Sequence, residues 1–294
     1  MPSVNSAENI EIYYETFGFD DRSTDPSFDS AGPALLLVNG LGSQLNGYPE
    51  EFCEGLVDRG FSVIRFDNRD VGLSSRTENP ETGEATDYTL SHMAADGIAI
   101  LDDLGIEAAH VAGMSMGGMI VQTMAIEYPD RVLTMTSIMS TTGEREYGKS
   151  SEEAFEALMS PPPDTSTEAG ISAAIEQDVV HRKIWASPEW YDEELVREYF
   201  VESWARSADN RADLQYAAVV ASGSRAELLP HVQTPTLVIH GDEDTLIDIS
   251  GGRRTAELLP NAELLEIEGM GHDIPKQTWQ QIIHGITNLA SSNA

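Results

Sequence analysis

The sequence predicts an α/β fold with a mostly parallel, doubly wound sheet and a helical segment inserted between two of its strands. Three observations predict it. Short apolar runs, typical of strands buried on both faces, alternate with helical patterns along the chain. Glycine-rich or acidic loops follow several of these runs, at the strand ends where such sheets gather functional groups. Between residues 141 and 230 the strand runs stop and helical patterns remain.

The elements follow in a regular order. Alternating or wholly apolar runs predict strands, and apolar residues at helical spacing predict the helices between them. The expected strands span residues 10–17, 33–38, 61–66, 108–112, 132–139, 236–240 and 262–267. The expected helices span residues 49–59, 90–104, 119–128, 253–259 and 276–290.

The helical segment divides the chain into two predicted parts. Residues 1–140 and 231–294 form the core domain, and residues 141–230 form a helical lid, which we call the cap. Prolines punctuate the cap at 161–163 and 188. We expect it to cover the carboxyl ends of the strands, because it is inserted between two strands of one sheet.

One turn carries the strongest chemical signal. Residues 113–117 match the pattern G-x-S-x-G, with a strand run before them and a helical pattern after them. Ser115 would lie at the apex of a strained turn with its hydroxyl exposed. Gly113 and Gly117 would let the strand and the helix pass close together. The N–H of Met116 would point to where an oxyanion forms.

A histidine and an acid follow in the order serine, acid, histidine. His272 lies in a glycine-flanked turn after a strand, whereas the other six histidines lie in strands or in or near helical segments. Asp242, Asp244 and Asp248 compete for the role of the acid, since all three follow the strand at 236–240. The alternative is that all three aspartates belong to a solvated acidic loop and have no catalytic role.

Composition excludes several functions. With 50 Asp and Glu against 17 Lys and Arg, the net charge of −33 argues against nucleic acid or an anionic membrane as a partner. No apolar run is long enough for a membrane span, and no signal peptide is visible. Cys53 is the one cysteine and fits a reducing cytoplasm. The acidic composition has two open explanations, adaptation to salt and drift.

The chain resembles the α/β-hydrolases, and in particular capped bacterial serine esterases of the aclacinomycin methylesterase type. The resemblance covers nearly the whole chain and is weakest in the cap. It rests on the motifs PALLLVNGLGS, VIRFDNRDVGLS, HVAGMSMGG, TPTLVIHGDEDTLID and EIEGMGH. It implies Ser115 as nucleophile, His272 as general base and Asp244 as acid.

The same resemblance implies the N–H groups of Leu41 and Met116 as oxyanion donors. Two positions depart from the family pattern. Asn39 stands where the family usually has histidine before the oxyanion loop, and Asp248 stands where a proline often follows the acid. Asn39 changes how the oxyanion loop is supported, and Asp248 weakens the assignment of Asp244 as the acid.

The expected function is hydrolysis of a carboxylic ester of a small molecule, with small to medium apolar acyl groups or methyl esters, through an acyl-enzyme. No metal or cofactor is expected, and the sequence does not determine the oligomeric state. The alternatives with the same triad are a C–C bond hydrolase, an amidase and a cofactor-free perhydrolase. A ligand-binding protein on the same scaffold is the alternative outside catalysis. The residues expected to line the pocket are Gly40, Met114, Met119, Tyr199, Trp204 and Met270, although the two aromatics could equally serve core packing.

Overall fold

The computed structural model describes residues 2–6, 10–19, 32–77 and 87–293 of the chain. Its strands form one sheet in the order β1-β2-β4-β3-β5-β6-β7-β8. The two pairs that involve β2 are antiparallel, and all the others are parallel. The strands are β1 Ser3–Asn5, β2 Glu11–Phe17, β3 Ala34–Val38, β4 Ser62–Phe66, β5 Ala109–Met114, β6 Val132–Ile138, β7 Thr236–Gly241 and β8 Ala262–Ile267.

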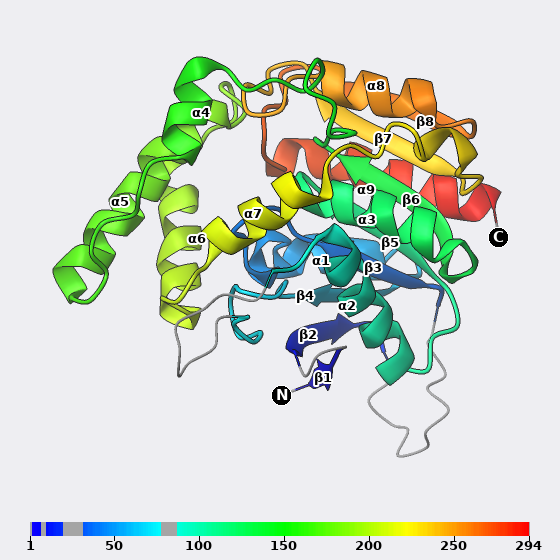
Figure 1. Ribbon diagram of the computed structural model, residues 1–294, viewed down its shortest axis with the longest axis horizontal. Helices are drawn as coiled ribbons and strands as arrows, with labels where there is room; N and C mark the ends of the chain where they lie inside the picture. The colour runs from blue at the N-terminus through cyan, green and yellow to red at the C-terminus, as the bar shows by residue number, and fades with distance from the viewer. Residues whose placement is uncertain (1, 7–9, 20–31, 78–86, 294) are drawn as a thin grey trace.

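Helices cover both faces of this sheet (Figure 1). Alternate residues of a strand point to opposite faces, so Leu36 and Leu37 of β3 belong to different apolar clusters. The face with Leu36 packs against α2 and α3, and the end of α8 joins it. The face with Leu37 packs against α1 and α9. These helices are α1 Glu50–Val57, α2 Leu90–Asp103, α3 Met116–Glu127, α8 Ser250–Leu258 and α9 Lys276–Ser292.

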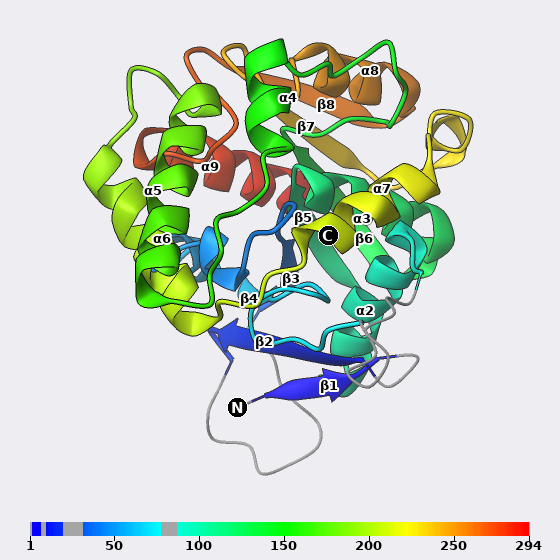
Figure 2. The same cartoon turned by 60° about the vertical axis from the view of Figure 1, so that its left-hand side comes forward.

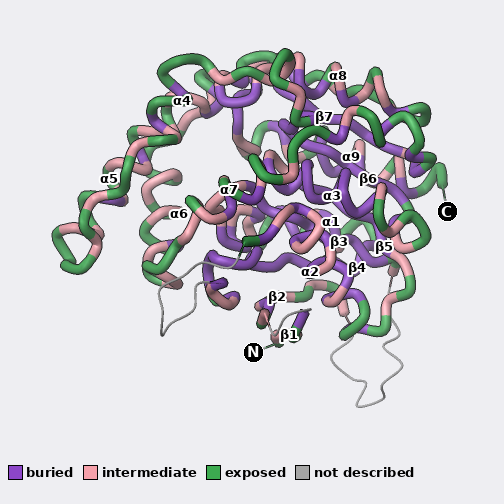
Figure 3. Tube along the Cα trace, in the orientation of Figure 1, coloured by how far each residue is buried: buried purple, intermediate pink, exposed green. Residues whose placement is uncertain are grey.

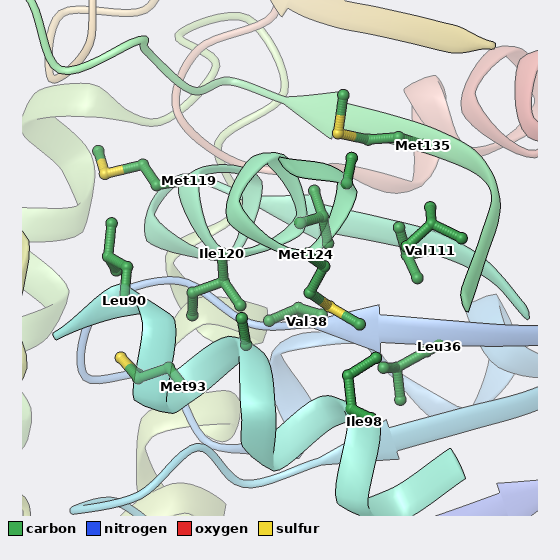
Figure 4. Close-up of a cluster of buried hydrophobic side chains, with 14 of the residues drawn as sticks. Leu36, Val38, Leu90, Met93, Ile98, Val111, Met119, Ile120, Met124 and Met135 are labelled. Atoms are coloured by element: carbon green, nitrogen blue, oxygen red, sulfur yellow. The ribbon is translucent and has the colours of Figure 1, made fainter. Parts of the chain in front are cut away.

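The cluster between β3, α2 and α3 fixes the helix that follows the G-x-S-x-G turn (Figure 4). Ile120 and Met124 on α3 face Met93 on α2 and Val38 on β3, and all four are fully buried. Each buried side chain of this size contributes about 1.5–3 kcal/mol through the area it removes from water. The start of α3 is therefore anchored on a well-packed support.

The predicted cap consists of helices. Between β6 and β7 the chain forms α4 Glu152–Leu158, α5 Glu168–Trp185, α6 Glu193–Arg206 and α7 Ala212–Ser222. α5 and α6 pack side by side and project from the body of the protein (Figures 1 and 2). Most of their residues are exposed or half-buried, whereas most of the strands are buried (Figure 3). Their stability therefore depends on a few contacts with the core.

The predicted fold class is confirmed, with every expected strand and helix present to within a few residues. Two differences have local causes. The strand β1 was not predicted, because three residues at a sheet edge are too short to show a period. α3 begins at Met116 rather than Met119, because the glycines at 117 and 118 mask its first turn. None of the helices in the described ranges is long and apolar enough to cross a membrane.

Candidate active site

Ser115 lies in a strained turn between β5 and α3. Its backbone has φ 55° and ψ −121°, a region that side-chain-bearing residues rarely adopt. The two glycines allow this turn: a Cβ on Gly113 would lie 2.1 Å from the carbonyl oxygen of Gly117. A Cβ on Gly117 would lie 2.1 Å from the carbonyl oxygen of Val38. The strand, the turn and the helix thus pass as closely as the sequence predicted.

The turn is held by hydrogen bonds to the end of β6. The N–H of Ser115 donates to the carbonyl of Ile138 at 2.9 Å, and the Ser140 hydroxyl donates to the carbonyl of Ser115 at 2.7 Å. Met116 is the first residue of α3, where an N–H has no acceptor within the helix. The Met116 N–H is therefore available to an anion beside Ser115.

The loop after β3 lies directly against Ser115. A Cβ on Gly40 would approach the Ser115 Cβ to 3.1 Å and its Oγ to 3.6 Å, so a bulkier residue would crowd the hydroxyl. The next turn of this loop is fixed by α7, because the Gly42 N–H donates to the Gln215 Oε1 at 2.8 Å. Leu41, one of the two expected oxyanion donors, lies between these two contacts.

His272 and Asp244 are hydrogen bonded. The distance from Nδ1 of His272 to Oδ2 of Asp244 is 2.7 Å, and both side chains are buried. The other two candidate acids bond elsewhere. Oδ1 of Asp242 accepts the N–H of Gly269 at 2.7 Å, and the Asp248 carboxylate accepts the N–H groups of residues 149 and 250, both at 2.8 Å. Of the three acids, Asp244 is thus the one bonded to His272.

Every acceptor position of Asp244 is occupied. Its Oδ1 accepts the N–H groups of Leu246 and Ile247, both at 2.9 Å. Burial alone would raise the pKa of Asp244, but the charge on His272 and hydrogen bonds from His240 and His272 lower it to about 2. Asp244 is therefore a carboxylate at neutral pH, as an acceptor for an imidazole N–H must be.

A second histidine reaches the same carboxylate. Nε2 of His240, at the end of β7, lies 3.3 Å from Oδ2 of Asp244, and both side chains are fully buried. Sequence reasoning predicted His240 only as a packed strand residue. The signal that could have revealed it is its spacing, since His240 lies near the end of the strand, four residues before the acid.

The residues predicted to line a pocket lie in different surroundings. Met119 belongs to the apolar cluster on α2 and α3 (Figure 4), and Met270 is fully buried in the cluster on the opposite face. Met114 is half-buried beside Ser115. In the cap, Trp204 donates its Nε1–H to Asp178 at 2.9 Å, and Tyr199 packs edge-on against the adjacent phenylalanine. A contact between these side chains and a substrate stays a prediction.

The end of α5 is bonded to the loops that carry Asp244 and His272. The carbonyl of Trp185 accepts the N–H of His272 at 2.6 Å, and the carbonyl of Ile184 accepts the Thr245 hydroxyl at 2.9 Å. The buried Ser187 hydroxyl accepts the N–H of residue 271 at 2.9 Å and donates to the carboxylate of residue 273 at 2.5 Å. One helix end therefore contacts both loops.

The end of α6 is bonded to the loop beside Ser115. Arg206 forms a salt bridge with the buried Asp67 at 3.0 Å and donates to the Gln44 Oε1 at 2.6 Å. Asp67 also accepts the N–H of Leu45 at 2.6 Å, and Gln44 donates to the carbonyl of Ser203 at 2.8 Å. The predicted cap thus contacts the core next to each group of the candidate site.

The chain is similar to known hydrolases over most of its length. The rhodomycin D methylesterase DnrP of Streptomyces peucetius is 32% identical over 267 residues, which cover 84% of this chain and 87% of that protein. The rhodomycin D methylesterase DauP of a Streptomyces species is 30% identical over 274 residues, which cover 84% and 87%.

Similarity extends to solved structures. A meta-cleavage product hydrolase from Pseudomonas fluorescens has a TM-score of 0.77 at 20% identity, covering 100% of this chain and 98% of that one, which indicates a shared fold. A family model described as the alpha/beta hydrolase fold matches residues 33–277. With the strand order, the serine turn and the Asp244–His272 pair described above, these matches show that the chain belongs to the α/β-hydrolase family.

Proposed function

We propose that this protein is a serine esterase that cleaves a carboxylic ester of a small molecule through an acyl-enzyme on Ser115. The observation that carries the proposal is the 2.7 Å hydrogen bond between Asp244 and His272, in a chain that also has Ser115 in a strained G-x-S-x-G turn. In such a triad the histidine and the acid activate the serine hydroxyl.

In the proposed reaction Ser115 Oγ attacks the ester carbonyl, and Nε2 of His272 takes its proton. The Asp244 carboxylate accepts the Nδ1–H, holds that tautomer and stabilises the imidazolium. The N–H groups of Met116 and Leu41 stabilise the oxyanion of the tetrahedral intermediate. His272 then protonates the leaving alcohol, and a water molecule, activated by the same histidine, releases the acid.

The proposed substrate is a neutral ester, and a methyl ester of an apolar molecule in particular. Two relatives at or above 30% identity are named as methylesterases. A net charge of −33 repels anions, so a masked carboxyl group suits this protein better than a free one. The similarity to a C–C bond hydrolase concerns the fold, so it does not favour that alternative.

We further propose that residues 141–230 act as a cap that selects substrates. The ends of α5 and α6 bond to loops next to His272 and Ser115, and we expect the cap to enclose the substrate space above them. Residues that enclose a substrate change its affinity and not the reacting groups. We therefore expect the cap to influence acyl preference more than the chemical step.

The proposal is tested with an activated aryl ester and rapid mixing. We expect a burst of phenolate equal to the concentration of active sites, followed by slower turnover, because an activated ester acylates the serine faster than water releases the acyl group. Ser115→Ala should fold normally and lose about 10⁴-fold or more of the activity, leaving only binding and oxyanion effects. Labelling of a different serine by an organophosphonate would contradict the assignment.

A substrate panel then distinguishes the reaction classes. A methyl ester, an amide and a vinylogous diketone, each releasing the same apolar acid on hydrolysis, should be offered at equal concentration. The proposal expects the ester to have the highest kcat/KM. A higher value for the diketone would identify a C–C bond hydrolase instead.

A further inference from the structure

His240 lies behind the candidate triad rather than in it. It is the fifth residue of β7, its side chain is fully buried, and its Nε2 lies 2.8 Å from the carbonyl oxygen of Ile247. The same nitrogen lies 3.3 Å from Oδ2 of Asp244. One ring nitrogen thus contacts both the catalytic carboxylate and the end of the loop that carries it.

The surroundings of the ring determine where its proton lies. The two groups facing Nε2 are oxygen acceptors, so Nε2 must carry a hydrogen. Nδ1 has no hydrogen-bond partner among the described residues, and it packs against α8, where a Cβ on Gly252 would lie 2.4 Å from it. The geometry therefore fits the Nε2–H tautomer, with the single proton shared between Asp244 and Ile247.

We propose that His240 is a positioning residue for the esterase reaction, which holds the Asp244 carboxylate so that Oδ2 faces His272. The inference rests on the proposed function and extends it to a fourth side chain. The backbone N–H groups of Leu246 and Ile247 fix only Oδ1 of Asp244. Rotation of the carboxylate plane about Oδ1 remains soft, because this torsion has broad minima. The Nε2–H of His240, 3.3 Å from Oδ2, limits that rotation together with the 2.7 Å bond to His272.

The bond to Ile247 adds a second effect. It ties the end of the loop at 244–247 back to the strand, so His240 joins both ends of the loop. Among charged groups near the ring, Asp244 and His272 lie in the loops, and Glu266 of β8 is its partner in strand register. Glu266 is paired with Arg253 of α8 at 2.7 Å, and Ile138, the last residue of β6, is apolar. Nε2 of His240 thus has two polar contacts, the 2.8 Å hydrogen bond to Ile247 and the 3.3 Å contact with Asp244.

The test compares three substitutions at 240 with a control. Gln can place an amide N–H where Nε2 lies, Asn can reach only the position of Nδ1, and Leu removes the donor. We expect His240→Leu to lower kcat about 10- to 100-fold, as small misplacements of catalytic groups do, with KM changed by less than about twofold. His240→Gln should recover most of the loss and His240→Asn little of it.

The control is His110→Leu. His110 is also a buried strand histidine with one side-chain hydrogen bond, at 2.8 Å to Thr134, but it lies near the start of β5, whereas Ser115 follows the end of that strand. All rates are expressed per active site titrated with an organophosphonate, so that unfolded protein does not count. Titration of Ser115 in the unmodified protein tests the proposed function by itself, and its failure is distinguishable from a failure at 240.

A lower kcat at nearly unchanged KM, with rescue by Gln and not by Asn, separates positioning of the carboxylate from support of the fold. Equal kcat values in His240→Leu and His110→Leu would overturn the proposal. If His240→Leu does not fold, equal activity of the Gln and Asn variants would overturn it.

Discussion

The carbonyl oxygen of Trp185, the last residue of α5, accepts the backbone N–H of His272 at 2.6 Å. A residue of the helical insertion thus helps to hold the histidine of the candidate triad. The adjacent carbonyl of Ile184 accepts the hydroxyl of Thr245, next to Asp244. The position of α5 and the geometry of the Asp244–His272 pair are therefore physically coupled.

This coupling predicts an effect of Ser187→Ala on both stability and rate. The hydroxyl accepts the N–H of Gly271 and donates to Asp273 in a buried position, so its removal leaves polar groups unpaired. Such a loss costs about 1–3 kcal/mol. We expect a lower melting temperature and about a 10-fold lower kcat, because His272 is adjacent to both partners. Ser172→Ala, on the exposed side of α5, is the control and should change neither quantity.

Asparagine substitutions distinguish the acids. In Asp244→Asn the amide oxygen must accept the N–H groups of Leu246 and Ile247, so its NH₂ group faces Nδ1 of His272. That arrangement imposes the wrong tautomer, and we expect kcat to fall by about 10⁴-fold. Asp242→Asn keeps an acceptor for the N–H of Gly269 and should stay within about threefold of the unmodified enzyme. A larger effect at 242 than at 244 would reverse the assignment.

The low pKa of Asp244 predicts the form of the pH profile. Burial raises this pKa, but His272 and His240 lower it to about 2 from the ordinary value of 3.8, so the group stays ionised above pH 4. Asp244 should therefore add no proton to the acid limb of kcat/KM above pH 4, so the slope of that limb should not exceed one. A depressed carboxyl pKa stabilises the folded state above 3.8, and this stabilisation is lost as the pH falls toward 2. A slope of two above pH 4 would show that Asp244 also titrates there.

Salt should stabilise this protein. With 50 acids and 17 bases, the acids exceed the bases by 33, and the repulsion among the excess carboxylates opposes the folded state. The Debye length falls from about 30 Å at 0.01 M to about 3 Å at 1 M, which removes that repulsion. Exposed pairs such as Arg253–Glu266 are weakened too, but each contributes only about 0–1 kcal/mol. We expect the melting temperature to rise up to 1 M NaCl, and a flat or falling midpoint would favour drift in composition.

The sequence predicted the order of strands and helices because each depends on a local pattern. Residues 34–38 form an unbroken apolar run of strand length, and the glycines at 113 and 117 mark a turn that other residues could not form. The antiparallel pairing of β2 was not predicted, since register between distant segments leaves no local period.

What the sequence determined by itself was the α/β fold and the positions of Ser115, Asp244 and His272 at the ends of strands. The tertiary structure decided which of three acids meets His272, which histidine stands behind that acid, and where the cap touches the core. Asp244 and His272 are 28 residues apart, and Ser187 and Asp273 are 86 apart. Such pairs form only when the packed sheet brings strand ends together. A hydrogen bond requires its two atoms to be placed to within a few tenths of an ångström, and no local sequence pattern encodes that placement.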